Sequence, residues 1–276
     1  MPELPEVETI VRQLQEHLIG KVIARVEILR PSQWKQNDPT LISGQLIGAK
    51  ITRIHRRAKF ILVDFHLGCQ LMIHLRMTGK LIWAPKELPP DKFTRTIFFF
   101  TDGSSLHFSD TRALGRLVLL NCSETAGSLA RLGIEPLSPA WQIQNIKPLF
   151  RQSRLTMKDF LLDQTKIAGI GNIYANEILF RAGIHPERRA LTLTDEETER
   201  LFHIIPKVLE LAIEKMGTSI GDKISDYRSV YNEQGEFQNI LAVYGREGKP
   251  CLKCGARIIR IKQKSRSSFV CENCQK

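Results

Sequence analysis

The sequence has no long uninterrupted hydrophobic run. Although 42% of its 276 residues are hydrophobic, no segment approaches the roughly 18 consecutive apolar residues that a membrane-spanning helix requires. The first eight residues carry three glutamates, where a secretory signal peptide would need basic residues followed by an apolar stretch. We therefore expect a globular, cytosolic protein with enough apolar residues for two domains and a small appendage.

The sequence also has fewer acidic residues than basic residues. The chain has 29 Asp and Glu residues against 40 Lys and Arg residues, which gives a formal net charge of +11 at pH 7. This excess favours a polyanionic partner, and nucleic acid is the first candidate. Charge alone does not decide, because a basic balance can also serve solubility or binding to an acidic membrane.

Cysteine is scarce outside the C-terminal end of the chain. Four of the six cysteines form two pairs, Cys251-x-x-Cys254 and Cys271-x-x-Cys274, separated by residues 255–270. This spacing is typical of a four-thiolate zinc site on a β-hairpin, and it makes disulfides or free thiols poorer interpretations in a cytosolic chain. Four thiolates leave no open position for water, so we predict a structural zinc ion.

The segment between these cysteine pairs is strongly basic. A positively charged finger of this kind suits a phosphate backbone. Its basic residues include Arg257, Arg260, Lys262, Lys264 and Arg266.

The first residues predict a reactive amine. Removal of Met1, which is usual before a small second residue, would leave Pro2 with a free secondary amine. An α-amino group titrates near about pH 8, so a useful fraction is unprotonated at neutral pH. Attack of a secondary amine on a sugar aldehyde carbon gives a cationic iminium, which favours β-elimination. Glu3 is adjacent and could act as the acid or base.

A helix is predicted directly behind this amine, with Pro5 in its first turn and Gly20 after its end. Its apolar positions recur at helical spacing, at Val7, Ile10, Val11, Leu14 and Leu18. The positive end of such a helix disfavours protonation of the amine. A simpler interpretation is that Glu3, Glu6 and Glu8 only complement the helix N-terminus, and the helix considered alone would favour it.

Short runs rich in Val, Ile, Leu and Phe follow the helix and are typical of β-strands. They cover residues 22–29, 46–54, 59–66, 69–75, 96–101, 105–109 and 116–121. Turn signals such as Asp102-Gly103 separate several of them, so about the first 130 residues predict a β-sandwich with the helix packed on it. Cys69 and Cys122 lie in these apolar surroundings and are interpreted as core thiols.

The second half of the chain changes to a helical period. We predict helices over residues 156–163 and 172–181, the latter stopped by Gly183, and a further helix opened by Thr194. Residues 217–239 are polar and interrupted by glycines, which indicates a mobile loop.

Two further features could contact an anion. The turn Gly169-Ile170-Gly171-Asn172 would place backbone N–H groups at a helix N-terminus with the Asn172 amide at the cap, although two glycines before a helix are often a plain turn. Lys59 opens a strand after a run of basic residues. It could belong to a solvated basic edge or be directed at DNA.

Several motifs occur together, in order, along the whole chain. They are Pro2-Glu3-Leu4-Pro5-Glu6, Arg57-Ala58-Lys59, His74-Leu75-Arg76-Met77-Thr78-Gly79, Asp163-Gln164, Gly169-Ile170-Gly171-Asn172-Ile173-Tyr174-Ala175-Asn176-Glu177 and the terminal cysteine pairs. In these motifs the sequence resembles the formamidopyrimidine-DNA glycosylases. The resemblance implies an α+β multidomain fold with DNA bound in the cleft between two lobes. The expected parts are an N-terminal β-sandwich with a leading helix at residues 1–132, a helix-two-turns-helix domain at 133–240 and a zinc-finger β-hairpin at 241–276.

The resemblance also implies a catalytic set. Pro2 would attack C1′ of the damaged nucleotide, and Glu3 would supply and remove protons. Lys59 would assist base loss and elimination and bind phosphate. Arg266 would hold phosphate from the finger and donate a proton for δ-elimination, and the four cysteines would hold one structural Zn²⁺.

A second set of residues is implied to contact the duplex. Met77, Arg112 and Leu114 would occupy the gap left by the flipped base, and the loop at 217–239 would close over that base. The remaining DNA-contacting positions are His74, Arg154 and Asn172.

Two positions depart from the family pattern. Leu114 stands where the family usually has a phenylalanine wedge, and Phe93 stands where it has a DNA-contacting histidine. Leucine can still act as a wedge but stacks less well, so lesion search and strand kinking are the functions affected.

The implied activity is that of a bifunctional DNA glycosylase and abasic-site lyase, which removes 8-oxoguanine and formamidopyrimidines and cuts the strand by β,δ-elimination. Its partner would be damaged double-stranded DNA, bound by a monomer at the nucleoid in a bacterial cytoplasm. A sister group acting on oxidised pyrimidines is the enzyme alternative, but that group looks different at Leu4, where it carries glycine. A non-catalytic DNA-binding module would be expected to have lost Pro2, Glu3 or Lys59, and all three are present.

Overall fold

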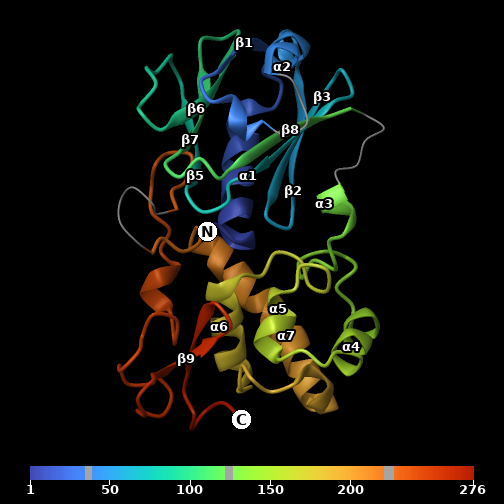
Figure 1. The fold of residues 1–276 in the computed structure, drawn as a ribbon, viewed down its shortest axis with the longest axis vertical. Helices are drawn as coiled ribbons and strands as arrows, with labels where there is room; N and C mark the ends of the chain where they lie inside the picture. Colours follow the sequence, from blue (N-terminus) through green and yellow to red (C-terminus); the bar gives the residue numbers. More distant parts are fainter. Residues whose placement is uncertain (35–38, 122–126, 221–226) are drawn as a thin grey trace. The chain divides into compact units, whose positions relative to one another are not determined.

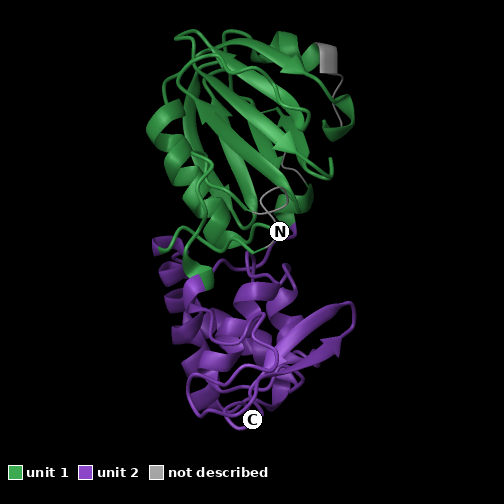
Figure 2. Cartoon of the chain, turned by 90° about the vertical axis from the view of Figure 1, so that its left-hand side faces the viewer, with its two compact units in different colours: residues 1–130, 215–238 green, residues 131–214, 239–276 purple. Residues whose placement is uncertain are grey.

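The chain folds into two compact units in a computed structural model, drawn in Figures 1 and 2. The first unit comprises Met1–Ala130 and Lys215–Gln238, and the second comprises Arg131–Glu214 and Asn239–Lys276. The structure describes residues 1–34, 39–121, 127–220 and 227–276. Cys122 and the central part of the predicted loop, residues 221–226, lie outside the described residues.

The first unit is the predicted β-sandwich, built from two four-stranded antiparallel sheets. One sheet has the order β1-β6-β7-β5, with β1 at Ile23–Ile28, β6 at Thr94–Phe100, β7 at Ser105–Asp110 and β5 at Gly79–Ala84. The other has the order β2-β3-β4-β8, with β2 at Ile51–Arg57, β3 at Phe60–Phe65, β4 at Gln70–His74 and β8 at Arg116–Leu120.

One hydrophobic core fills the space between the two sheets. Alternate residues such as Ile61 and Val63 of β3 and Phe108 of β7 are buried in it, as expected for strands with one inward face. Helix α1 (Leu4–Leu18) packs against β2 and β3. Its predicted apolar stripe is confirmed, since all five residues of the stripe are buried.

The structure differs from the sequence-based prediction at two strands of this unit. Residues 46–54 do not form one strand, because Leu46 ends helix α2 (Pro39–Leu46) and Gly48 turns the chain with a φ of 78° before β2 begins at Ile51. Strand β5 was not predicted, although its residues are all buried or half-buried. The remaining short elements are η1 (Pro31–Gln33) and α3 (Gly127–Ala130).

The second unit is helical, with a C-terminal β-hairpin. Its helices are α4 (Ile143–Arg151), α5 (Met157–Leu162), α6 (Asn172–Ala182), η2 (Ala190–Thr192) and α7 (Asp195–Glu214). The short helix η3 (Phe237–Ile240) contains the point in the sequence at which the chain passes from the first unit to the second. The hairpin consists of β9 (Ile259–Gln263) and β10 (Arg266–Val270). None of the helices in the described ranges is long and apolar enough to cross a membrane.

Local sequence signals set the ends of these helices. Thr156 caps α5 by accepting a hydrogen bond from the Asp159 backbone N–H, and the Thr194 hydroxyl accepts one from the backbone N–H of Glu197 at the start of α7. Gly183 ends α6 in the left-handed conformation, with a φ of 69°, which a glycine adopts without steric cost. The predicted stop at Gly183 and start at Thr194 are therefore confirmed.

The described residues from 217 to 238 are part of the first unit and are anchored in it, in contrast to the mobile loop expected at 217–239. Tyr227 and Val230 are buried in the core of the sandwich. The Val230 N–H donates to Gln13 Oε1 over 3.1 Å, and the Val230 carbonyl accepts from the Trp83 N–H over 3.2 Å. Burial of the Tyr227 and Val230 side chains explains why this otherwise polar segment is held against the sandwich.

Candidate functional site

The N-terminal motif forms the buried start of α1. Glu3 is the N-cap of the helix, and its backbone N–H donates to Glu6 Oε2 over 2.7 Å in a reciprocal capping box. Pro2, Glu3 and Glu6 are all buried. The acidic residues therefore do cap the helix, but Glu3 and Glu6 do so inside the protein rather than on a solvated first turn.

Glu6 also connects this motif to the segment that begins at Gly217. Its Oε1 atom accepts a hydrogen bond of 2.7 Å from the Thr218 backbone N–H. A Cβ atom at Gly217 would lie 2.7 Å from Glu6 Oε1, and the φ of Gly217 is 78°, so both space and backbone conformation require glycine there. One buried carboxylate thus fixes the position of Glu3 relative to the first residues of the 217–239 segment.

Lys59 and His74 are brought together in the first unit. Lys59 follows Ala58 in the tight turn between β2 and β3 and is only 7% exposed, and His74 ends β4 with 9% exposed. Burial, reinforced by the positive charges of Arg76 and Lys59, lowers the pKa of His74 to about 3. Because His74 Nδ1 accepts the Arg76 N–H over 3.0 Å, the ring is neutral with its hydrogen on Nε2. His74 is therefore an uncharged hydrogen-bond donor at neutral pH.

This lowered pKa predicts acid destabilisation of the first unit. In the unfolded state the pKa of this histidine is about 6.5, so on acidification the unfolded state binds a proton before the folded state does. The free energy of unfolding therefore decreases as the pH falls from about 6.5 towards 3, by up to about 1.4 kcal/mol per pH unit. In His74→Gln we expect this contribution to the pH slope of urea-unfolding free energies to disappear. The same substitution at the exposed His203 should leave the slope unchanged. An unaltered slope in His74→Gln would contradict the assignment.

Two loops of the first unit are joined through the buried carboxylate of Asp110. The Asp110 side chain accepts hydrogen bonds from the Thr78 hydroxyl, from Gln33 Nε2 over 3.0 Å and from the Gly115 N–H over 2.7 Å. Thr78 Oγ1 accepts in turn from the Arg112 N–H over 3.1 Å. The turn after β4 and the turn after β7 therefore hold each other in place.

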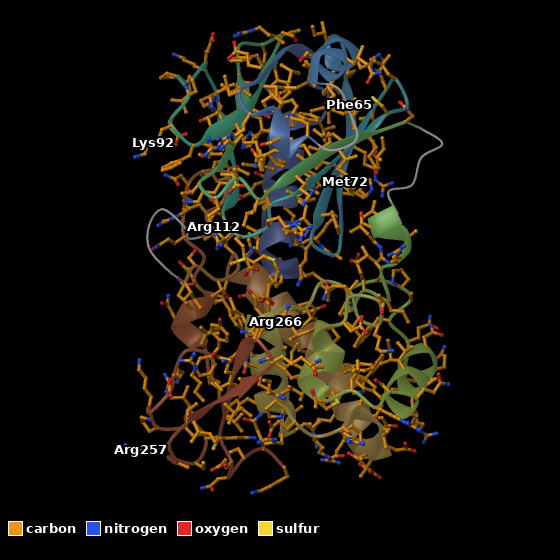
Figure 3. All side chains as sticks on the ribbon, in the orientation of Figure 1. Phe65, Met72, Lys92, Arg112, Arg257 and Arg266 are labelled. Carbon is orange, nitrogen blue, oxygen red and sulfur yellow. The ribbon has the colours of Figure 1, made fainter. Side chains whose placement is uncertain are left out.

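Three side chains project from these joined turns. Met77 is 42% exposed and Leu114 is 44% exposed, and the Arg112 side chain is exposed as well (Figure 3). Only the backbone N–H of Arg112 contacts Asp110, over 3.2 Å, and its guanidinium has no partner among the described residues. Met77, Arg112 and Leu114 therefore project from two turns that are held together by hydrogen bonds. The Arg112 side chain takes no part in the hydrogen bonds to Asp110.

The four C-terminal cysteines meet in the second unit. Their Sγ atoms all lie within 4.8 Å of one another, with 3.4 Å between Cys254 and Cys271 and 3.9 Å between Cys251 and Cys274. Tetrahedral thiolates bound at about 2.3 Å from zinc are separated by roughly 3.8 Å, so the cluster fits. It is a site for one structural zinc ion, which confirms the prediction from spacing.

Arg266 opens β10 next to the turn that precedes α6. Its side chain is exposed and labelled in Figure 3. Asn172 Nδ2 donates to the carbonyl of Ser267, the residue after Arg266, over 3.4 Å. Asn172 is the first helical residue and Gly171 the N-cap, so the predicted cap position was one residue off. Asn172 Oδ1 is buried and has no hydrogen-bond partner in the described part of the chain.

Arg154 is the remaining predicted DNA-contacting residue. Arg154 is exposed between α4 and α5, and its side chain has no hydrogen-bond or ion-pair partner among the described residues. Phe93, one of the two departures, is half-buried and lies 5.0 Å below the Lys92 ammonium. The Phe93 carbonyl accepts a hydrogen bond of 2.9 Å from the Asp110 N–H, so Phe93 lies beside the joined turns that carry Arg112 and Leu114.

Sequence reasoning missed the role of Glu177, the last residue of the motif at residues 169–177. Its carboxylate is fully buried on α6 and accepts the backbone N–H groups of Ala242, Val243 and Tyr244 over 2.9 to 3.0 Å. It therefore fixes the segment that leads into the zinc finger. An isolated acidic residue among apolar neighbours of a predicted helix is the signal that could have indicated a buried acceptor.

Three family models match the chain in sequence order. They are described as the formamidopyrimidine-DNA glycosylase N-terminal domain, at residues 1–117, the H2TH domain of the same enzyme, at 132–223, and a zinc finger found in FPG and IleRS, at 248–276. Among similar curated proteins, the formamidopyrimidine-DNA glycosylase of Pelotomaculum thermopropionicum is 41% identical over 100% of this chain and 99% of its own length. That of Carboxydothermus hydrogenoformans is 42% identical over the full length of both chains.

Solved structures agree with these sequence matches. The MutM (Fpg) protein of Thermus thermophilus superposes with a TM-score of 0.89 at 37% identity, covering 99% of this chain and 98% of that one. A Lactococcus lactis Fpg (MutM) bound to DNA containing N7-benzyl-Fapy-dG gives a TM-score of 0.91 at 32% identity over 100% of both chains. The similarity therefore extends over both compact units.

Proposed function

The chain belongs to the formamidopyrimidine-DNA glycosylase family, and we propose that Pro2 and Glu3 carry out its chemistry. It is a base-excision-repair DNA glycosylase and abasic-site lyase for oxidised purines, and its partner is damaged double-stranded DNA. The observation that carries the residue assignment is the buried Pro2-Glu3 pair at the start of α1, fixed by Glu6.

In this mechanism Pro2 is the nucleophile. With Met1 removed, its nitrogen forms a bond to C1′ of the damaged nucleotide as the bond from C1′ to the purine breaks and the leaving base takes up a proton. Pro2 then loses its N–H proton, and the C1′–O4′ bond breaks as O4′ takes up a proton, which opens the sugar ring and leaves an iminium on Pro2. Loss of a C2′ proton then breaks the C3′–O bond, and loss of the C4′ proton breaks the C5′–O bond. Glu3, buried beside Pro2, transfers protons in these steps.

The basic and amide side chains bind the strand around this chemistry. Lys59 and the neutral His74 offer a charged and an uncharged donor from one place in the first unit, which suits a phosphate oxygen. Asn172 and Arg266 offer the corresponding pair in the second unit, and Arg266 supplies the proton for δ-elimination. Arg154, being exposed and unengaged, adds a further phosphate contact.

We assign these tasks to three parts of the chain, residues 1–132 with the nucleophile, 133–240 with the helix-two-turns-helix element and 241–276 with the zinc finger. Within the second part, residues 215–238 fold with the first compact unit, so the helix-two-turns-helix element itself lies before residue 215. The enzyme works as a monomer. Its relatives are bacterial enzymes, so we place its action on the chromosome at the nucleoid, within the bacterial cytoplasm.

Single-turnover excision on a panel of duplexes, each with one defined lesion, tests this function. We expect rapid release of 8-oxoguanine and formamidopyrimidines, followed by products of both β- and δ-elimination. Thymine glycol, an oxidised pyrimidine, should be the slower substrate. A clear preference for thymine glycol would support the oxidised-pyrimidine alternative, and tight lesion binding without base release would support a non-catalytic module.

The exposed Arg112 side chain leads to a prediction about how the enzyme recognises the base opposite the lesion. Cytosine presents a ring nitrogen and a carbonyl oxygen that both accept hydrogen bonds, and the unengaged Arg112 guanidinium can donate to both. Adenine does not offer that pair of acceptors. The difference should favour excision opposite cytosine by roughly 1–3 kcal/mol, which is about 5- to 150-fold.

The variant Arg112→Ala should therefore lose the preference for cytosine over adenine in single-turnover excision of 8-oxoguanine. Arg116→Ala, which removes another exposed arginine four positions along the chain, is the matched control and should keep the preference. If Arg112→Ala lowers thermal stability but retains the preference, the side chain serves the loop and does not read the opposite base.

A further inference from the structure

The β10 strand that begins with Arg266 is fastened to the helices of its unit by a buried lysine. Lys158 of α5 is 1% exposed, and its Nζ donates to Ser268 Oγ over 2.9 Å and to the Ser267 carbonyl over 3.1 Å. Both acceptors directly follow Arg266 in the sequence. Fully buried lysines are rare because removing the charge from water is costly. A specific role for this side chain is therefore expected.

Other side chains of α5 and α6 hold the residues on either side of Arg266. The Phe269 N–H donates to Asn176 Oδ1 over 2.8 Å, and Lys264, two residues before Arg266, pairs with Asp159 over 2.9 Å. Lys158, Asp159 and Arg266 also line one pocket of about 390 Å³ between α5 and the hairpin turn. Arg266 thus lies between two sets of contacts that all originate from these two helices.

The zinc ion alone cannot fix this position. Arg266 stands five residues before Cys271 on an extended strand, which places it about 16 Å from the metal site at about 3.3 Å per residue. An antiparallel hairpin of two strands is marginally stable by itself. The far end of the hairpin therefore depends on contacts with the helices for a defined position.

We propose that Lys158 is a positioning residue for Arg266. By holding the Ser267 carbonyl and the Ser268 hydroxyl, it fixes the direction in which β10 starts and hence where the Arg266 guanidinium meets the DNA. This inference rests on the proposed role of Arg266 in phosphate binding and δ-elimination. Lys158 acts only through the strand and does not itself touch the reacting atoms.

The test uses Lys158→Met, which keeps the length of the side chain and removes its hydrogen bonds. Saturating full-length enzyme is mixed with a duplex carrying a preformed abasic site, and β- and δ-elimination products are measured in a single turnover. We expect the ratio of δ- to β-product to fall at least tenfold, with one zinc per chain and borohydride trapping retained. Hydrogen exchange at the amides of residues 267–269 should accelerate. The control is Lys147→Met, a lysine on α4 that pairs with Asp195 and should change none of these quantities.

Failure of this inference is distinguishable from failure of the proposed role of Arg266. If Arg266→Ala itself keeps δ-elimination, the role of Arg266 is wrong. If Arg266→Ala loses it but Lys158→Met keeps both the product ratio and slow exchange, the positioning role is wrong. The positioning role would also be wrong if Lys158→Met lost zinc, borohydride trapping and the δ-elimination product together. Such a result would mean that the substitution disrupts the enzyme as a whole and not only the position of Arg266. Should Lys158→Met fail to fold, Ser268→Ala removes one acceptor and must still lower the ratio.

Discussion

Replacing Pro2 with glycine, or blocking its nitrogen by retaining Met1, should abolish base excision and covalent trapping while leaving duplex binding intact. With Met1 in place the Pro2 nitrogen is an amide, which has no lone pair available for attack on C1′. Glycine would restore only a primary amine, whose imine can lose its proton and so withdraws electrons less strongly from the sugar. Because the nucleophile is removed or weakened at the chemical step, we expect a loss of at least about 10³-fold in the single-turnover rate.

The measurement pairs excision kinetics with intact-protein mass spectrometry, so that the state of Met1 is known for each preparation. Binding to a duplex with a non-cleavable abasic analogue provides the control, since Pro2 contributes to reaction more than to affinity. The prediction would be wrong if a protein shown to retain Met1 excised 8-oxoguanine at the full rate.

Removing zinc should have the second largest effect. The buried apolar cluster of the finger is small and includes Val243, Ile258 and two of the metal-binding cysteines, Cys251 and Cys271. Structural zinc sites contribute about 10–16 kcal/mol of apparent binding free energy at neutral pH, which such a small core cannot replace. Chelation or Cys254→Ser should therefore unfold the finger and displace Arg266.

The loss of DNA affinity should be large even if only the Arg266 contact is counted. A hydrogen bond to a charged group is worth about 1.5–3 kcal/mol, which corresponds to about 10- to 150-fold in affinity. The β-sandwich, which has its own core, should retain its thermal transition. Cys69→Ser, outside the finger, is the matched control and should keep both zinc and affinity. Purified, fully active protein that contains no zinc would contradict this role.

Features encoded by neighbouring residues were predictable from the sequence. The apolar stripe of α1, the stop at Gly183 and the start at Thr194 are set by contacts within one or two turns of the chain. The zinc cluster was equally accessible, because two closely spaced cysteine pairs constrain their own geometry.

The features that were missed depend on contacts between distant segments. Glu177 binds backbone groups 65 to 67 residues away, and Asp110 joins two turns through Thr78, 32 residues before it. Neither partner can be inferred from a periodic pattern. Strand β5 is six residues long and begins on the last residue of the His74–Gly79 motif, so its short stretch carried little weight. The apolar run from Leu46 to Ile51 was interpreted as one strand because the turn at Gly48 is a backbone property that hydrophobicity does not record.

The most direct test of the catalytic assignment is to locate the covalent bond. The enzyme is mixed with a duplex carrying 8-oxoguanine opposite cytosine, the intermediate is reduced with borohydride, and the digested protein is mapped by mass spectrometry. We predict a single adduct in which a sugar remnant is attached to the nitrogen of Pro2 at the mature N-terminus. An adduct on a lysine such as Lys59, or excision with no trapped complex, would contradict it.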